Sequence, residues 1–465
     1  MDVAVIGAGP VGLMLAAELR LGGATVVVLD RRAGPDERPR ANGLGGRIVE
    51  QLDHRGLLER FTAEAAFAGP FPGFPFGPVP LNFTKLDGPP PLRGLMLQQP
   101  RMEALLAERA VELGVEIRRG HELLEDDTVR GPDGEYRLDA KYVVGCDGAH
   151  SRVRELAGIG FPGTTDDELL RLGHFRTDQP FDLFTTAVPD GLRQGWNRRP
   201  AGRVLVTSLT PGVVIVGVRE VTPEPPSEPT LVEFRESVRR VLGADLPLDE
   251  PLWLSRTVSR ARLAERYRAG RVFLAGDAAH VFPAGGSSLN VGLLDAVNLG
   301  WKLAAVVRGE ADDALLDSYH DERHPVAART LTQTRVQALL ERLTGEDGDA
   351  LRTLFGELAA FEEPTRHLAG LLRDADELQY VPDLPLTVGG ATTRVAEIMR
   401  GARTVLFDFA DRADLREAAG SHVKIVTTTC SEAVQDALLV RPDGVVAWSG
   451  DDPAALREAI GAPGR

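Results

Sequence analysis

This 465-residue chain has little cysteine, no excess of positive charge and no long apolar run. Its two cysteines, Cys146 and Cys430, form neither a CxxC pair nor a disulfide framework, which favours a reducing cytoplasm. The sequence has no run of about 18 uninterrupted apolar residues, so we expect no membrane partner. The formal net charge of −15 argues against a nucleic-acid-binding surface, which is usually basic. We therefore expect a cytoplasmic globular protein of two or three domains.

What the chain does contain is a glycine-rich turn near its N-terminus. The apolar residues 3–6 are followed by glycines at GxGxxG spacing and then by a predicted helix. In this pattern Gly7 allows the tight turn, Gly9 lets the backbone approach a pyrophosphate, and Gly12 lets helix and strand pack closely. Asp30 ends the next apolar strand, at the right distance to accept a hydrogen bond from a ribose hydroxyl. The pattern predicts a dinucleotide site.

Two later segments place an aspartate beside a glycine directly after an apolar strand. They are Asp147-Gly148 and Gly276-Asp277. Such a strand end presents a carboxylate, and the glycine lets a backbone come close to a ligand. Each motif taken alone is also typical of an ordinary strand-end turn. A long helix predicted over residues 289–307 follows Asp277, and its N-terminus would stabilise negative charge nearby.

The pattern along the chain indicates further organisation. Helices are predicted over residues 13–22 and 99–114, and Pro132-Asp133-Gly134 predicts a hairpin turn. Strand-like alternation over residues 172–254 indicates a second domain built on a mainly antiparallel sheet. After a linker near residues 374–385, two strand signals and a hairpin turn at residues 441–444 indicate a small third α/β domain.

With these motifs in order, the chain resembles the FAD-dependent aromatic hydroxylases, the single-component flavoprotein monooxygenases of the phenol and p-hydroxybenzoate hydroxylase type. It is most similar to members acting on polyketide antibiotics, the angucycline hydroxylase and rifampicin monooxygenase group. Residues 440–448 resemble a hairpin in the C-terminal thioredoxin-like domain of that group, which lacks redox cysteines. Cys430 is likewise the only cysteine in that part of this chain.

This resemblance implies an α/β fold of the p-hydroxybenzoate hydroxylase type, with a Rossmann-type FAD-binding domain, an antiparallel-sheet substrate domain and a thioredoxin-like domain. We expect the FAD-binding domain to comprise residues 1–70, 98–160 and 258–376, the substrate-binding domain residues 71–97 and 161–257, and the thioredoxin-like domain residues 377–465.

The resemblance also implies roles for individual residues. Asp30 would bind the adenosine ribose, Gln99 the ribityl or phosphate region, and Asp277 the ribityl chain. Asp147 belongs to a motif that serves both FAD and NADPH. The flavin-ring environment, to which no acid or base is assigned, would comprise Arg40, Pro283, Leu289 and Asn290. The full set of expected FAD contacts is Gly7, Gly9, Gly12, Asp30, Arg31, Arg40, Gln99, Asp147, Gly148, Gly276, Asp277, Pro283, Gly286, Leu289 and Asn290.

The implied reaction is hydroxylation of a polycyclic, polyketide-type aromatic substrate with non-covalent FAD, O2 and NADPH or NADH, through a flavin C4a-hydroperoxide. The sequence has no second nucleotide fingerprint, in agreement with the family. Three alternatives stay open: Baeyer–Villiger oxygenation, a dehydrogenase or oxidase without oxygen insertion, and a flavin- or ligand-binding protein without turnover. We expect a monomer or homodimer.

One departure from the family pattern lies beside the expected flavin ring. Gly285-Gly286-Ser287-Ser288 stands where the family usually has Gly-Gly-Gln-Gly. We interpret Ser288 as the N-cap of the helix that starts at Leu289. The alternative is that the two serines change flavin movement, which is the only feature favouring a protein without turnover.

Two further residue groups have competing interpretations. Phe71, Phe74 and Phe76 either pack against the middle sheet or line a pocket suited to a flat polycyclic substrate. His320 and His324 are one helical turn apart, a spacing compatible with a metal, but the sequence offers no third ligand and we predict no metal site.

Overall fold

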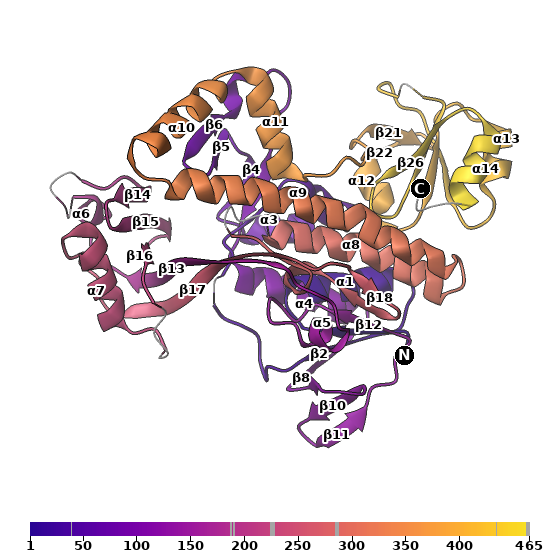
Figure 1. Cartoon of the computed structure of the whole chain (residues 1–465). Helices are drawn as coiled ribbons and strands as arrows, with labels where there is room; N and C mark the ends of the chain where they lie inside the picture. Colours follow the sequence, from indigo (N-terminus) through magenta and orange to yellow (C-terminus); the bar gives the residue numbers. More distant parts are fainter. Residues whose placement is uncertain are drawn as a thin grey trace.

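The chain is built on three main sheets, arranged side by side (Figure 1). The computed structural model describes residues 1–38, 40–186, 188, 191–223, 228–283, 288–433 and 435–461. The antiparallel sheet lies at one end in Figure 1, the C-terminal sheet at the other, and the N-terminal parallel sheet between them.

The central sheet is parallel apart from one edge strand. Its order is β18 (Arg268–Ala269), β19 (Val272–Leu274), β12 (Tyr142–Gly145), β1 (Val3–Ile6), β2 (Val26–Asp30) and β8 (Glu116–Arg119), with β18 antiparallel. Surrounding helices are α1 (Pro10–Leu21), α2 (Arg47–His54), α3 (Leu58–Glu64), α4 (Gln99–Glu112), α5 (Arg152–Leu156) and α8 (Ser288–Val307). β9 (Glu122–Leu123), β10 (Thr128–Gly131) and β11 (Gly134–Arg137) form an appended antiparallel sheet that contains the predicted hairpin turn.

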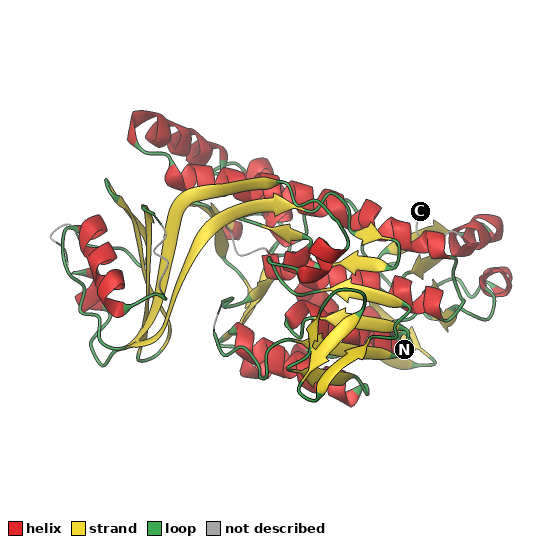
Figure 2. Cartoon of the chain, turned by 60° about the horizontal axis from the view of Figure 1, so that its bottom comes forward, coloured by secondary structure: helices red, strands yellow, loops and turns green. Residues whose placement is uncertain are grey.

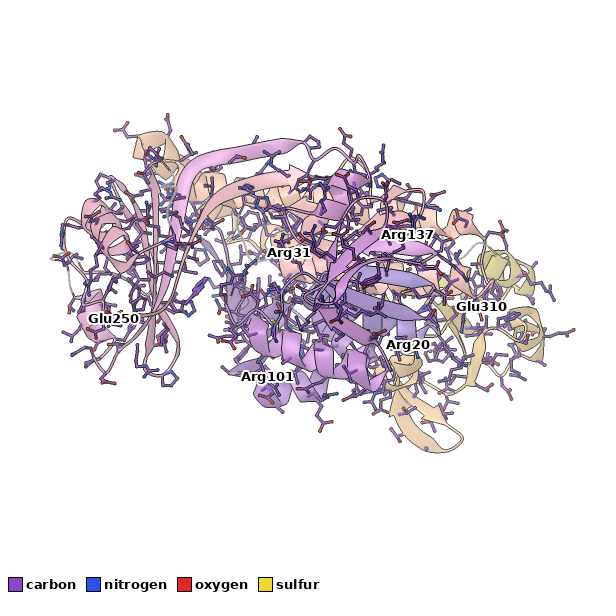
Figure 3. All side chains as sticks on the ribbon, turned by 90° about the horizontal axis from the view of Figure 1, so that it is seen from below. Arg20, Arg31, Arg101, Arg137, Glu250 and Glu310 are labelled. Atoms are coloured by element: carbon purple, nitrogen blue, oxygen red, sulfur yellow. The ribbon has the colours of Figure 1, made fainter. Side chains whose placement is uncertain are left out.

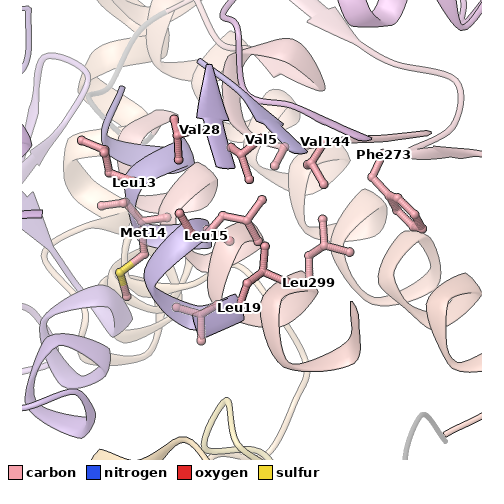
Figure 4. Packing of buried hydrophobic residues seen from close by; sticks show 14 of the residues in the cluster. Val5, Leu13, Met14, Leu15, Leu19, Val28, Val144, Phe273 and Leu299 are labelled. Carbon is pink, nitrogen blue, oxygen red and sulfur yellow. The ribbon is translucent and has the colours of Figure 1, made fainter. Parts of the chain in front are cut away.

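Apolar side chains from strands and helices form the core of this region (Figure 4). Val5, Val28 and Val144 of the strands face Leu15 of α1 and Leu299 of α8, and all five are completely buried. Burying one such side chain contributes about 1.5–3 kcal/mol. Strands covered by helices on both faces are continuously apolar rather than alternating, which explains the valine-rich sequences of β1 and β2.

The second sheet is antiparallel, with long curved strands that reach toward the central sheet (Figure 2). Its order is β14 (Gly195–Arg199), β15 (Gly202–Thr210), β16 (Val213–Val221), β13 (Gly163–Arg176), β17 (Pro251–Leu263) and β20 (His280–Val281). Helices α6 (Asp182–Thr185) and α7 (Leu231–Leu242) belong to this unit, and α7 packs on β15 and β16.

Short strands and three helices connect the two large sheets. The strands are β3 (Leu44–Gly45), β7 (Arg93–Met96) and β4 (Phe67–Pro70) in one small sheet and β5 (Gly73–Phe76) and β6 (Val79–Asn82) in another. The helices are α9 (Asp317–Arg342), α10 (Gly345–Leu358) and α11 (Glu362–Arg373). Single 3-10 turns are η1 (Phe83–Lys85), η2 (Gly276–Ala278), η3 (Asp313–Leu316) and η4 (Met399–Gly401).

The C-terminal unit contains a mixed sheet in the order β24 (Lys424–Thr427), β23 (Val405–Asp408), β25 (Ala437–Val440) and β26 (Val446–Gly450). Its other elements are β21 (Pro385–Val388), β22 (Ala391–Arg394), α12 (Val395–Ile398), α13 (Ala413–Ala419) and α14 (Pro453–Gly461). The predicted turn at residues 441–444 joins β25 to β26 and contacts α8 and α9. We call this contact, formed by Asn298, Trp301, Lys302, Glu322, Arg441 and Asp443, the C-terminal seam.

Among the described residues, no helix combines the length and apolarity that a membrane crossing needs. In Figure 3, Arg31 lies near the middle of the molecule, between Glu250 of the antiparallel unit and Glu310 toward the C-terminal unit. The residues around Arg31 form the site described next.

Candidate active site

A cavity of about 880 Å³ opens at the carboxyl ends of the parallel strands, the edge at which sheets of this kind bind ligands. The predicted site residues that line it are Gly7, Gly9, Asp30, Arg31, Arg40, Gln99, Asp147, Gly148, Asp277, Leu289 and Asn290, together with Phe71 and Phe74. Gly12, Gly276, Pro283 and Phe76 do not line it, and Gly286 lies outside the described residues. The three glycine-bearing motifs thus meet around one cavity.

The glycines of the first turn differ in what surrounds them. A Cβ on Gly7, whose φ is +110°, would lie 2.4 Å from the Cys146 carbonyl oxygen. A Cβ on Gly12 would lie 2.0 Å from the Gly7 carbonyl oxygen, so both positions require glycine for packing. A Cβ on Gly9 would have no atom of the described residues within 4 Å, and Gly9 lines the cavity. The bare backbone at Gly9 therefore leaves room for a ligand.

Helix α1 directs its N-terminus at this space. Gly9 is its N-cap and provides no side-chain hydrogen bond, and Pro10 occupies the first helical position. The N–H groups of the first turn consequently have no side-chain cap, and they carry the positive end of the helix dipole. This arrangement is suited to binding a phosphate group.

Asp30 lies at the end of β2 and is engaged by neighbours. Its carboxylate accepts hydrogen bonds from the Ala8 amide at 2.8 Å, from the Arg32 amide at 2.8 Å and twice from the Arg32 guanidinium. Burial raises the pKa of Asp30, but these hydrogen bonds outweigh burial and lower it. Asp30 is therefore an ionised group at the cavity wall.

Three arginines gather at the same wall around Asp36, which the sequence analysis did not identify. Asp36 accepts Arg38 Nε at 2.7 Å and contacts Arg32 Nη1 at 3.0 Å and Arg40 Nη2 at 3.2 Å. The hydrogen bond from Arg38 is the main reason that the pKa of Asp36 is strongly lowered. Asp36 and all three arginines line the cavity, where guanidinium groups favour an anionic ligand.

Asp147 faces its own helix rather than only the cavity. Its carboxylate accepts hydrogen bonds from the Ser151 hydroxyl, the Arg152 amide at 2.7 Å and the Val153 amide at 3.2 Å. These bonds satisfy the first N–H groups of α5, so the side chain shapes the strand-end turn. Gly148, with φ of +87°, keeps the following backbone open toward the cavity.

Asp277 and the start of α8 form another wall of the cavity. Helix α8 begins at Ser288, and the Ser288 hydroxyl donates a 2.6 Å hydrogen bond to Asp277. The sequence predicted Ser288 as the N-cap of a helix starting at Leu289, whereas the described part of α8 already includes Ser288 and its hydroxyl contacts Asp277. Asn290 Oδ1 accepts the Gly45 amide at 3.2 Å, which ties the first turn of α8 to β3.

A buried aspartate that sequence reasoning missed supports the Gly276-Asp277 turn from behind. Asp295 is completely buried and accepts hydrogen bonds from the Gly276 amide at 3.2 Å and Arg323 Nε at 2.9 Å. Its Oδ2 also lies 2.7 Å from His280 Nε2. The signal in the sequence was an acidic residue within the apolar stretch that became α8.

His320 and His324 are placed by packing around Tyr267. Their rings lie 5.8 and 5.4 Å from the Tyr267 ring, measured between centroids. His320 Nδ1 accepts the Tyr267 amide at 3.3 Å, and His324 Nε2 lies 3.1 Å from the Ala264 carbonyl oxygen. These contacts account for both histidines as parts of the fold.

Aromatic side chains form one side of the cavity. Phe71 and Phe74 line it, with ring centroids 5.7 Å apart, and Phe67 stacks on Phe71 at 5.4 Å. Phe76 corrects the expectation of three pocket phenylalanines: it is 2% exposed and stacks on Phe355 of α10. Packing against α10 removes its ring from the cavity. Pro283 does not line the cavity of the described residues, and its carbonyl oxygen accepts the Ser259 hydroxyl at 3.0 Å.

Two buried polar atoms of residues that line the cavity have no hydrogen-bond partner in the described part of the chain. They are Asn42 Oδ1 and Glu103 Oε2. A buried acceptor without a donor is unfavourable, so these atoms suit a ligand rich in hydroxyl or N–H groups. With the open backbone at Gly9 and the arginines around Asp36, the residues fit a dinucleotide such as FAD.

Comparison with known proteins agrees with this geometry. Residues 1–334 match the family model described as an FAD binding domain, and residues 379–463 match the C-terminal domain of aromatic-ring hydroxylases. Rifampicin monooxygenase from Streptomyces venezuelae is 40% identical over 98% of this chain and 97% of its own. Dialkyldecalin synthase from Streptomyces rugosporus is 38% identical over 96% and 95%. CabE, an aromatic hydroxylase from angucycline biosynthesis, is 36% identical in sequence to this chain. Its crystal structure superposes on this chain with a TM-score of 0.89, and the match covers 100% of this chain and 99% of the CabE chain.

Proposed function

Because this chain belongs to the FAD-dependent aromatic-ring hydroxylases, we propose that it uses NADPH or NADH and O2 to hydroxylate a polycyclic aromatic substrate of polyketide type. Membership confirms the predicted family and the p-hydroxybenzoate hydroxylase-like fold class. The observation that carries the proposal is one continuous cavity: Gly9, Asp277 and the phenylalanine wall all line it.

When bound, FAD supplies two-electron transfer from the nicotinamide donor and the activation of oxygen. The first turn of α1 and the arginines around Asp36 would hold its phosphates. Leu289 and Asn290 place the first turn of α8 at the cavity, where its N–H groups would stabilise negative charge. Asp295 would hold the Gly276-Asp277 turn in position.

Phe71 and Phe74 would orient the substrate. Aromatic rings prefer offset-stacked or edge-to-face neighbours, so this wall favours a flat ring system. An apolar wall also keeps water away from the reacting atoms, which protects an activated oxygen species from side reactions. Related proteins are named as monooxygenases of rifampicin and of anhydrotetracycline, and this supports a polyketide-type substrate here.

The test begins with the visible absorbance of the purified protein, which should show bound flavin. NADPH and NADH oxidation is then measured with anthraquinones, angucyclinones and ansamycins in turn. We expect one class to accelerate oxidation and to yield a product with one added oxygen atom, whereas a colourless protein would contradict the proposal. Because Baeyer–Villiger oxygenation also adds one oxygen, the connectivity of the product by NMR separates the two reactions.

A second candidate function is supported by two observations. Dialkyldecalin synthase, whose name describes no oxygenation, is 38% identical to this chain, close to the 40% of the rifampicin monooxygenase. The Ser288 hydroxyl binds Asp277 beside the cavity, where the family usually has a glycine. A protein that holds FAD without redox turnover would convert its substrate to an isomer of unchanged mass and would leave NADPH unconsumed.

A further inference from the structure

Glu103 is a buried carboxyl group in the cavity that uses only one of its oxygens. It lies in α4, one turn after Gln99, and is 4% exposed. Its Oε1 accepts a hydrogen bond from Gln99 Nε2 at 2.8 Å. Its Oε2 is buried and has no hydrogen-bond partner among residues 1–38, 40–186, 188, 191–223, 228–283, 288–433 and 435–461. The open oxygen belongs to a residue that lines the cavity.

The charged groups near Glu103 come from the ends of two strands. Arg32 and Asp36 follow β2, and Arg119 ends β8. Burial raises the pKa of Glu103, Asp36 acts in the same direction, and the hydrogen bond from Gln99 and the two arginines oppose it. These strand ends are where the GxGxxG pattern places the adenosine half of a dinucleotide.

Asp30, the residue expected to bind the ribose, has less acceptor capacity left. A carboxylate has about four lone-pair sites, and Asp30 already accepts four hydrogen bonds from Ala8 and Arg32. Glu103 has a whole oxygen free. A ribose offers two hydroxyl donors, so a second acceptor at the cavity wall would complete the site.

We propose that Glu103 accepts a hydrogen bond from a hydroxyl of the adenosine ribose of FAD, a role that the sequence predicts for Asp30 alone. This inference rests on the proposed binding of FAD in the cavity. The bond would give the open Oε2 its donor and would add an interaction that exists only in the loaded protein. Glu103 is thus assigned as a cofactor-binding residue.

The test measures FAD affinity by titrating the apoprotein and following quenching of flavin fluorescence. Glu103→Gln replaces a charged acceptor with a neutral one, and we expect about 10-fold weaker binding. Glu103→Leu removes the acceptor, and we expect about 100-fold weaker binding. Glu108→Gln is the matched control, because Glu108 lies on the same helix but is exposed and pairs with Arg60; it should bind FAD as the wild type does.

An FAD analogue with a 2′,3′-dideoxyadenosine moiety tests which group of the cofactor is contacted. The wild-type protein should bind this analogue more weakly than FAD, and Glu103→Leu should discriminate between the two at least threefold less. Deleting both partners of one bond has a smaller effect than the sum of the single deletions. The thermal midpoint of the Glu103→Leu apoprotein should not fall, because the substitution removes a half-partnered buried carboxyl.

Unchanged FAD affinity in both Glu103 variants would overturn the inference while leaving the proposed function intact. A lower apoprotein midpoint with equal losses for FAD and the analogue would also overturn it, because that result indicates a structural role. A wild-type protein that binds no FAD would overturn the inference and the proposed function together.

Discussion

Glu322 in the C-terminal seam and Glu103 in the cavity are both largely buried glutamates on helices, but their surroundings differ. Glu322 accepts both terminal nitrogens of Arg441 at 2.8 Å and Asn298 Nδ2 at 2.6 Å, and lies 3.0 Å from Lys302 Nζ. Burial raises the pKa of both, yet the partners of Glu322 lower its pKa whereas that of Glu103 stays raised. The Glu322 carboxylate is satisfied within the chain and supports the fold, whereas Glu103 keeps one oxygen without a partner among the described residues, at the cavity where we infer that a ligand binds.

Breaking the seam should give the largest loss of stability. Arg441→Met leaves Glu322 and Asp443 buried without their main partner, so the free energy of unfolding should fall by about 3–5 kcal/mol. Denaturant unfolding measures this change. Arg239→Met, which removes the exposed pair with Asp245, is the control and should have no measurable effect. Equal stability of the two variants would mean that the seam contributes nothing, and FAD affinity should differ little between them.

Gly9→Val should weaken FAD binding while leaving the stability of the apoprotein nearly unchanged, the reverse of the effect expected for Arg441→Met. Within the described part of the chain, the new side chain would meet no atom within 4 Å of its Cβ, so the apoprotein should unfold at nearly the same temperature. The side chain would occupy the space of the phosphates, and we expect FAD affinity to fall at least about 100-fold, or about 3 kcal/mol. Flavin retained after gel filtration, together with the thermal midpoint, measures both effects. Retention of FAD at wild-type levels would remove the turn from the cofactor site.

Lowering the pH should decrease the free energy of unfolding through His54, which lies beside the hairpin turn of the C-terminal seam. This histidine of α2 is 5% exposed, and a Cβ on Gly444 would lie 3.2 Å from its ring. Burial, followed by the charge of Arg55, lowers its pKa from 6.5 to about 4. Between pH 6.5 and 4, His54 is therefore protonated in the unfolded chain but neutral in the folded chain. The free energy of unfolding present above pH 6.5 consequently decreases as the pH falls toward 4.

The loss from His54 amounts to roughly 3 kcal/mol at most. Denaturant unfolding between pH 7.5 and 4.5 measures it, and His54→Gln should flatten the profile over this range. An unchanged slope in the variant would assign the acid sensitivity to other groups.

The smallest expected change in stability concerns the segment between α11 and β21, which leads into the C-terminal unit. Ala375 has φ of +53°, a left-handed conformation that is unfavourable for a residue with a Cβ. Ala375→Gly relieves this strain, and the greater entropy of the unfolded glycine offsets part of the gain, so stability should rise by about 0.5 kcal/mol. A lower thermal midpoint would show that the buried Ala375 methyl group contributes more than the strain.

Local sequence patterns predicted the glycine-rich turn and the helix at the cavity, because the geometry of a turn or a helix depends on residues that are close in the sequence. The spacing of Gly7, Gly9 and Gly12 directly determines a turn, and the apolar stretch after Ser288 formed the expected helix. Phe76 stacks on Phe355, a residue more than 250 positions away in the sequence. The prediction that Phe76 lines the pocket rested on local composition, which carries no information about so distant a contact. Asp295 was missed for the same reason, because its partners Gly276, His280 and Arg323 are 15 to 28 residues away along the chain. Asp36 is different: its partners Arg32, Arg38 and Arg40 lie within four residues, and it was missed because it belongs to none of the recognised motifs.

The sequence by itself determined the nucleotide-binding turn, the order of the three motifs and the family, because short-range sterics and hydrophobic periodicity act between residues close in the chain. Only the tertiary structure decided which carboxylates are satisfied. Arg441 reaches Glu322 across 119 positions of the sequence, whereas among the described residues Glu103 has a donor for one oxygen alone. Burial and partnership are properties of the packed molecule, since they depend on which distant elements meet.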